Sequence, residues 1–298
     1  MNAMEKVFAL NATNELTEHI VYHKLALMEK NPENRTALER LSAQEKTHYE
    51  FWQSLLPETE AKKIRPRGYT VWGTPFLRTV LGVTFITKFL ETHEKDSAQN
   101  YQNMIGSIPA SHHAQFLQII EDEKSHERAL IAQLKEKRLD YIGFIVLGLA
   151  DAIVEITGVH AGFLGVTGST LIAGVAGIIV GFSAAISMGS ASYLQAKQDV
   201  GKSAVLSGFL TWASYFCSVV LLALPYFLIR MMIPAFITST SVGILLVAGF
   251  TFYGAIAFDR KFWREFAETV GLMLGTALAT FLLGLIVGSV FHINTGSF

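Results

Sequence analysis

The sequence predicts an all-α protein in which a charged four-helix bundle is followed by five membrane-spanning helices. Residues 1–139 hold 18 of the 24 Lys and Arg residues and 18 of the 25 Asp and Glu residues, and residues 140–298 hold the remaining 6 and 7. The first half repeats apolar residues every three or four positions, whereas the second contains five long apolar stretches. We therefore expect a soluble helical domain over 1–139 and a transmembrane domain over 140–298.

Composition narrows the range of functions. The formal net charge of -1 does not favour a nucleic-acid partner. The single cysteine, Cys217, excludes an intramolecular disulfide and any Cys-based zinc or iron–sulfur site. The N-terminal residues lack the apolar core of a signal peptide, so we expect the soluble half to stay in the cytosol.

The first two predicted helices place acidic residues where a bundle core should be apolar. Residues 3–30 form the first helix, which carries Glu15 on its apolar stripe and ends at Asn31-Pro32. The second begins after Asn34 and carries Glu45 and His48 between leucines and a tryptophan. A carboxylate on an apolar stripe is costly unless it is paired or binds a metal ion.

The next two helices repeat this pattern after a long connection. Residues 57–75 are rich in Pro and Gly and predict an irregular crossover, and the apolar run 76–85 is suited to lie near a bilayer. The third helix carries Glu91 and Glu94, and the fourth carries Glu123 and His126. Each Glu-x-x-His pair shares one helix face and suits a transition metal. A single such pair could be a solvated helix face, but two pairs on core stripes favour a metal site.

Four features resemble the rubrerythrin branch of the ferritin-like superfamily. They are Glu15 followed by Tyr22, the pair Glu45 and His48, Glu94 followed by Tyr101, and the pair Glu123 and His126. The resemblance implies a di-iron site in a ferritin-like bundle. Carboxylate and imidazole ligands suit Mn(II) as well as Fe(II), so manganese is the alternative metal. The implied ligands are Glu15, Glu45, His48, Glu94, Glu123 and His126, with Glu91 as an additional ligand. The Cys-x-x-Cys module of true rubrerythrins is absent, which argues against peroxidase turnover fed by that module.

Five apolar stretches in the second half are each long enough to span a bilayer. They cover about 140–165, 169–196, 203–229, 233–258 and 266–292. Lys and Arg residues cluster at alternate ends of these stretches, and only Arg230 lies on the other side. The positive-inside rule therefore places the bundle in the cytosol and the C-terminus outside.

The first two spans contain polar and soft side chains. Asp151 lies eleven residues beyond Asp140 and thus ~16 Å deep, and Glu155 shares its helix face. Acids at this depth typically mark an ion or proton pathway. Met188 in the second span has a comparable depth and a thioether that binds soft metals, although methionine also fills apolar gaps. Gly-x-x-x-Gly spacings in the second and fifth spans favour close helix packing or dimerisation.

The segments around these residues are similar to motifs of the vacuolar iron transporter family. The similarity covers Gly148 to Glu155 in the first span and Ala185 to Tyr193 in the second. It implies a homodimeric exchanger of Fe(II) for protons whose path uses Asp151 and Met188. The acid expected just after Met188 is replaced by Ser190 to Ser192. The fused arrangement resembles membrane-bound erythrin-type proteins of prokaryotes, which implies the cytoplasmic membrane as the location.

Together these patterns predict a transporter that exports Fe(II), or Mn(II), from the cytosol in exchange for protons. The bundle would capture or sense the metal, and ferroxidase activity there is compatible with the same ligands. The alternative is a membrane-anchored di-iron oxidase or peroxidase whose spans only tether it. A pure iron sensor would use the same sites. A tether needs no acids in mid-bilayer, which favours the transporter.

Overall fold

The computed structural model describes residues 2–90, 101, 104–123, 134, 139–199 and 201–292. Within these ranges the chain forms helices and no strand, so the all-α prediction is confirmed there. The chain divides into two compact units, Met1–Glu136 and Lys137–Phe298.

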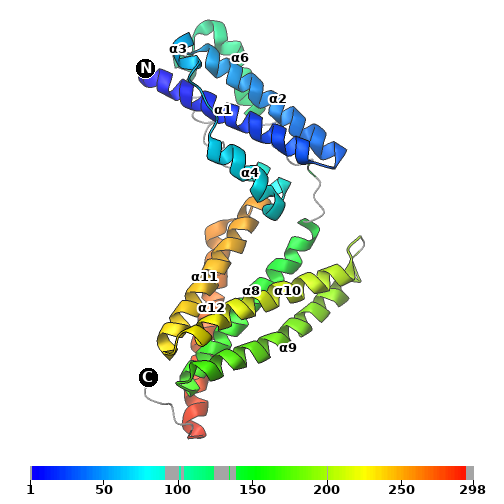
Figure 1. Ribbon diagram of the computed structural model, residues 1–298, viewed down its shortest axis with the longest axis vertical. Helices are drawn as coiled ribbons and strands as arrows, with labels where there is room; N and C mark the ends of the chain where they lie inside the picture. Colours follow the sequence, from blue (N-terminus) through cyan, green and yellow to red (C-terminus); the bar gives the residue numbers. More distant parts are fainter. Residues whose placement is uncertain are drawn as a thin grey trace. The chain divides into compact units, whose positions relative to one another are not determined.

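The first unit is built on two long helices that pack side by side, α1 (Ala3–Met28) and α2 (Pro32–Ser54) (Figure 1). Asn2 and Glu5 form a capping box at the start of α1, and Asn31 caps α2 just before Pro32. The short helix α6 (His113–Glu121) contacts α2. An aromatic core joins these elements, formed by Phe8, Phe51, Trp52, Tyr101 and Phe116.

The complete ferritin-like bundle stays a prediction. Residues 83–90 are helical, and a single 3-10 turn covers Ile105–Ser107. Residues 91–100 and 124–133, which would supply part of the third and fourth helices, lie outside the described residues.

The prediction of an irregular crossover over 57–75 was wrong for much of that segment. It contains the short helix α3 (Glu58–Ala61) and most of α4 (Gly68–Leu81). Pro75 lies inside α4, where a proline cannot donate a hydrogen bond to the carbonyl of Val71. The Lys24 ammonium donates to the Val71 oxygen instead, at 3.3 Å, so a side chain of α1 satisfies this carbonyl.

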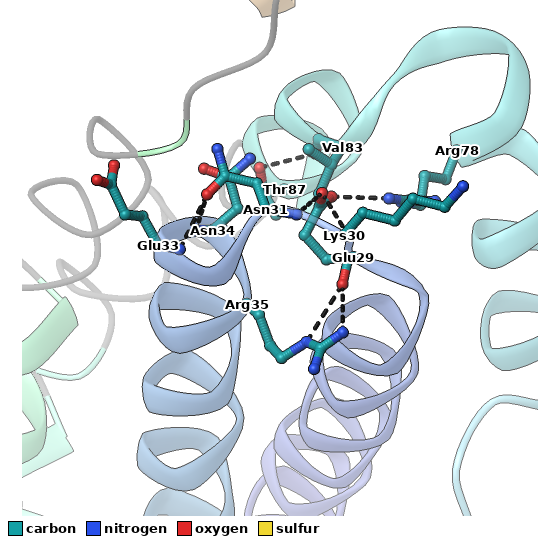
Figure 2. A network of polar contacts seen from close by, with 9 residues as sticks. All are labelled: Glu29, Lys30, Asn31, Glu33, Asn34, Arg35, Arg78, Val83 and Thr87. Atoms are coloured by element: carbon teal, nitrogen blue, oxygen red, sulfur yellow. Dashed lines mark hydrogen bonds and ion pairs between the residues drawn. The ribbon is translucent and has the colours of Figure 1, made fainter.

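A polar network connects the end of α1, the start of α2 and α4 (Figure 2). Arg78 of α4 donates to one carboxylate oxygen of Glu29 at 2.7 Å. The backbone N–H groups of Lys30 and Asn31 donate to the other oxygen at 2.9 and 3.1 Å. Arg35 of α2 donates to the Glu29 carbonyl at 2.8 and 3.2 Å. Glu29 therefore fixes three helices at one point.

The second unit contains five helices that are long and apolar enough to cross a membrane. They are α8 (Leu139–Val166), α9 (Thr170–Ala196), α10 (Ala204–Leu228), α11 (Met232–Ala257) and α12 (Phe262–Val290). The prediction of five long apolar helices is confirmed, and the last begins four residues earlier than expected, at Phe262. We describe the chain as a multi-pass membrane protein on this basis.

Helix α8 contacts all four other helices of this unit, and α9 packs closely along α10 (Figure 1). Glycines permit several of these approaches. A Cβ atom at Gly284 of α12 would lie 2.2 Å from the Gly162 carbonyl oxygen of α8. A Cβ atom at Gly271 or Gly275, by contrast, would have no described atom within 4 Å. Gly284 is therefore a packing residue within the chain, and Gly271 and Gly275 face open space.

Candidate metal centre and intramembrane acids

Helices α1 and α2 bring three potential ligands together inside the first unit. Glu15, Glu45 and His48 offer ligand atoms that all lie within 4.8 Å of one another, and the three side chains are buried. Glu15 comes from the middle of α1, and Glu45 and His48 lie one turn apart on α2. The periodicity of both helices therefore directs these polar groups into the unit together with its apolar core.

His48 stands between carboxylates from three helical segments. Its Nδ1 atom lies 3.6 Å from a Glu45 oxygen, 3.8 Å from a Glu15 oxygen and 3.7 Å from a Glu123 oxygen. Its Nε2 atom lies 3.6 Å from an Asp122 oxygen. The structure thus brings the predicted residues Glu15, Glu45, His48 and Glu123 together. The predicted ligands Glu91, Glu94 and His126 lie outside the described residues.

Sequence reasoning missed Asp122. In a regular α-helix, consecutive residues point about 100° apart, so Asp122 and Glu123 should not both face one site. The two carboxylates instead approach different sides of the His48 ring, because Asp122 lies beside Nε2 and Glu123 beside Nδ1. The apolar period marks only Glu123 as a core position, so it could not predict a second carboxylate beside the ring.

Two hydrogen bonds orient Glu15 within the cluster. Trp52 Nε1 and the Tyr101 hydroxyl both donate to Glu15 Oε1, at 3.2 and 3.1 Å. The other oxygen, Oε2, is the one that lies nearest His48. Burial alone would raise the pKa of Glu15, but attraction to the neighbouring His48 and the hydrogen bond from Tyr101 hold the pKa below its usual value. The surroundings of Glu15 therefore favour its ionised carboxylate form.

The donor set fits a divalent metal ion. Four carboxylates around one imidazole place an excess of negative charge in a buried region, and a cation would offset the mutual repulsion. Oxygen and imidazole ligands suit Fe(II), Mn(II) and Zn(II) alike, so the geometry does not discriminate among them.

A second group of polar residues lies in the membrane unit. Asp151 and Glu155 are partly buried and lie one turn apart on α8. The Tyr215 hydroxyl of α10 donates a hydrogen bond to Glu155 Oε2. Met188 of α9 packs against the apolar cluster that contains Tyr215. Tyr215 was missed in the sequence because a tyrosine in an apolar helix is commonly a packing residue.

Glu155 also borders a cavity between α8, α9 and α12. The cavity has a volume of ≈ 550 Å³ and is lined on α8 by Glu155, Gly158 and Gly162. Val180 of α9 and Thr276 and Thr280 of α12 complete much of its wall. Glu155 is the acidic residue in this lining, and its carboxylate also accepts the hydrogen bond from Tyr215 of α10.

His160 is a further buried polar residue of α8 that sequence reasoning did not single out. Its ring lies 4.1 Å from the ring of Tyr226, and a Cβ atom at Gly177 would lie 2.4 Å from its Nε2 atom. Gly177 therefore provides the space that the imidazole occupies between α9 and α10.

No protein-family model, curated protein or solved structure matches this chain. The resemblances to rubrerythrins and to vacuolar iron transporters therefore depend on the motifs alone.

Proposed function

We propose that this protein moves Fe(II), with Mn(II) as the alternative cation, out of the cytosol in exchange for protons. In this proposal the first unit captures the metal through Glu15, Glu45, His48 and Glu123, and Asp122 lies beside the opposite ring nitrogen of His48. The membrane unit then carries it along a path that includes Asp151, Glu155 and Met188. The chain would act as a homodimer in a prokaryotic cytoplasmic membrane, with the first unit on the cytosolic side.

One observation carries the proposal: a single chain combines a buried carboxylate–histidine cluster with two acids inside an apolar helix. Acids within an apolar span are costly and usually serve ion or proton movement. Asp151 and Glu155 are close enough on α8 to bind protons or a cation as a coupled pair. The hydrogen bond from Tyr215 supports a fixed orientation of Glu155.

The substitution Asp151→Asn tests the transport path. It conserves the size of the side chain and removes the charge that a divalent cation requires. We expect Fe(II) flux into inside-out proteoliposomes, driven by a pH gradient, to fall to background. The matched control is Asp199→Asn, which makes the same change at an exposed acid paired with Lys202 at 3.2 Å, and it should keep wild-type flux.

Flux at the wild-type level in Asp151→Asn, with the protein inserted and folded, would contradict the proposal. The membrane-anchored di-iron oxidase would then be the better account, because a tether has no need of this charge. Oxygen consumption with Fe(II) would be the measurement to pursue in that case.

A further inference from the structure

Helix α4 exposes an apolar and aromatic face. Four side chains, spaced three, four and four residues apart, lie along one side of the helix. This α4 face consists of Tyr69, Trp72, Phe76 and Val80, with exposed fractions of 76%, 76%, 71% and 70%. Four large side chains of this kind on adjacent turns are unusual on a surface that meets only water.

The opposite side of α4 is attached to the rest of the first unit. Val71 and Thr74 are buried on that side, and Arg78 is paired with Glu29 at 2.7 Å. Lys24 of α1 donates to the Val71 carbonyl and lies 3.9 Å from the centre of the Trp72 ring. These contacts hold α4 against α1, so the α4 face cannot turn inward without breaking them.

Positive charge precedes the α4 face. Arg65 and Arg67 are exposed just before α4 begins, and among the described residues no carboxylate forms an ion pair with either. Lys62 and Lys63 differ, because they pair with Glu58 and Glu60. The Arg65 guanidinium donates hydrogen bonds to the carbonyls of Lys62 and Ile64, at 3.0 and 2.8 Å. These bonds stiffen the segment, but they do not neutralise the positive charge of Arg65. A complementary surface would therefore be anionic next to the arginines and apolar next to α4.

The first unit is joined directly to an apolar helix that can cross a membrane. The first unit ends at Glu136, and the apolar helix α8 begins at Leu139. Only Lys137 and Arg138 lie between them in the sequence, so no long linker precedes the apolar helix. Trp and Tyr favour the boundary between headgroups and acyl chains, and Arg favours phosphate.

We infer that α4 lies in the surface of the membrane that holds the second unit, with the α4 face in the headgroup region of anionic phospholipids. The helix would lie parallel to the bilayer plane, as amphipathic interfacial helices do. Arg65 and Arg67 would contact lipid phosphate groups at its N-terminal end. The inference requires a membrane protein but not metal transport, so it can fail or succeed independently of the proposed function.

The test uses the full chain in liposomes that contain phosphatidylglycerol. Because Cys217 is the only cysteine, Cys217→Ala gives a background in which single cysteines can carry a nitroxide label. Labels are placed with Trp72→Cys, Phe76→Cys and Val80→Cys. Glu39→Cys on the exposed side of α2 is the aqueous control, and Leu245→Cys, 71% exposed on α11, is the lipid control. Collision rates with oxygen, which partitions into lipid, are compared with those of a water-soluble nickel chelate.

We expect the oxygen-to-nickel collision ratio at 72, 76 and 80 to be several-fold higher than at 39 and to approach that at 245. Replacing phosphatidylglycerol by phosphatidylcholine, or introducing Arg65→Gln with Arg67→Gln, should lower the ratio at 76. A ratio at 76 equal to that at 39 would overturn the inference, because the face would then be in water. Protection from both reagents would overturn it too and indicate a protein partner, and spin–spin broadening at 76 would identify that partner as a second copy.

Discussion

His48 determines the geometry of the candidate metal centre, because carboxylates from α1, α2 and the segment after α6 all approach its ring. Trp52 and Tyr101 add a second layer by fixing Glu15. Groups of this second layer commonly change metal affinity about 10–100-fold when they are removed. A direct ligand should matter at least as much.

The substitution Glu45→Gln should therefore weaken Fe(II) binding to the first unit by about tenfold or more. It removes one charge from the cluster and conserves the shape of the side chain. Glu50→Gln is the control, since Glu50 lies on the same helix but is exposed and paired with Lys46. Calorimetric titration of the full chain in detergent measures both. Equal affinities in the two variants would show that Glu45 is not a ligand.

Glu29 provides a prediction for the dependence of stability on pH. Burial alone would raise its pKa, but hydrogen bonds from the Asn31 and Lys30 backbones and the paired Arg78 lower the pKa below the ordinary value of 4.5. A folded-state pKa below the unfolded value stabilises the protein fully above about 4.5, and this stabilisation disappears as the pH falls through the folded pKa.

Glu29→Gln should accordingly lower the melting temperature near neutral pH, and the difference from wild type should shrink as the pH falls below 4.5. Glu39→Gln, an exposed change on α2, is the control and should leave the melting temperature unchanged. Thermal unfolding of the full chain at several pH values measures the difference. A difference that grew toward acid pH would contradict the assigned role of the Glu29–Arg78 pair.

The helices of the membrane unit show how far sequence patterns determine elements. Five long apolar helices were predictable because length and hydropathy alone decide which segments can span a bilayer. Helix α4 was not, because Gly68, Gly73 and Pro75 favour a break and tertiary contacts from α1 override that preference. The Gly-x-x-x-Gly pattern likewise could not tell Gly284, which touches α8, from Gly271, which faces open space.

Gly284→Ala should destabilise the membrane unit, since its Cβ atom would lie 2.2 Å from the Gly162 oxygen and force α8 and α12 apart. Overpacking of this kind costs about 1–3 kcal/mol. Gly271→Ala makes the same chemical change on the same helix without such a contact and should have little effect. Thermal unfolding in detergent compares the two. A larger loss of stability for Gly271→Ala would show that the α8–α12 packing is wrong.

In the proposed function, the first unit captures the metal ion and the membrane unit transports it. Part of the candidate site was predictable from sequence, because Glu15, Glu45, His48 and Glu123 occupy core positions that a helical period identifies. Asp122 and Tyr215 were not predictable, because the contact of Asp122 with the His48 ring and that of Tyr215 with Glu155 both join different helices. Residue spacing along one helix cannot report contacts of this kind.

Separate roles for the units predict separate kinetic effects. Glu45→Gln should raise the metal concentration that gives half-maximal flux and leave the maximal flux near wild type, because capture is impaired and the path is intact. Asp151→Asn should abolish flux at every concentration. Concentration series in proteoliposomes distinguish these outcomes. Loss of maximal flux in Glu45→Gln would mean that the first unit forms part of the path itself.

The contact between Lys24 and the Val71 carbonyl makes two distant positions depend on each other. Lys24 has a carbonyl to bind there because Pro75 lacks the N–H group that would otherwise occupy it. Replacing Pro75 with alanine would restore that N–H group and reduce the cost of losing Lys24, so the two substitutions should not be additive. The order in which the two positions change during evolution would therefore matter. A lysine already present at position 24 would lower the cost in stability of introducing a proline at position 75.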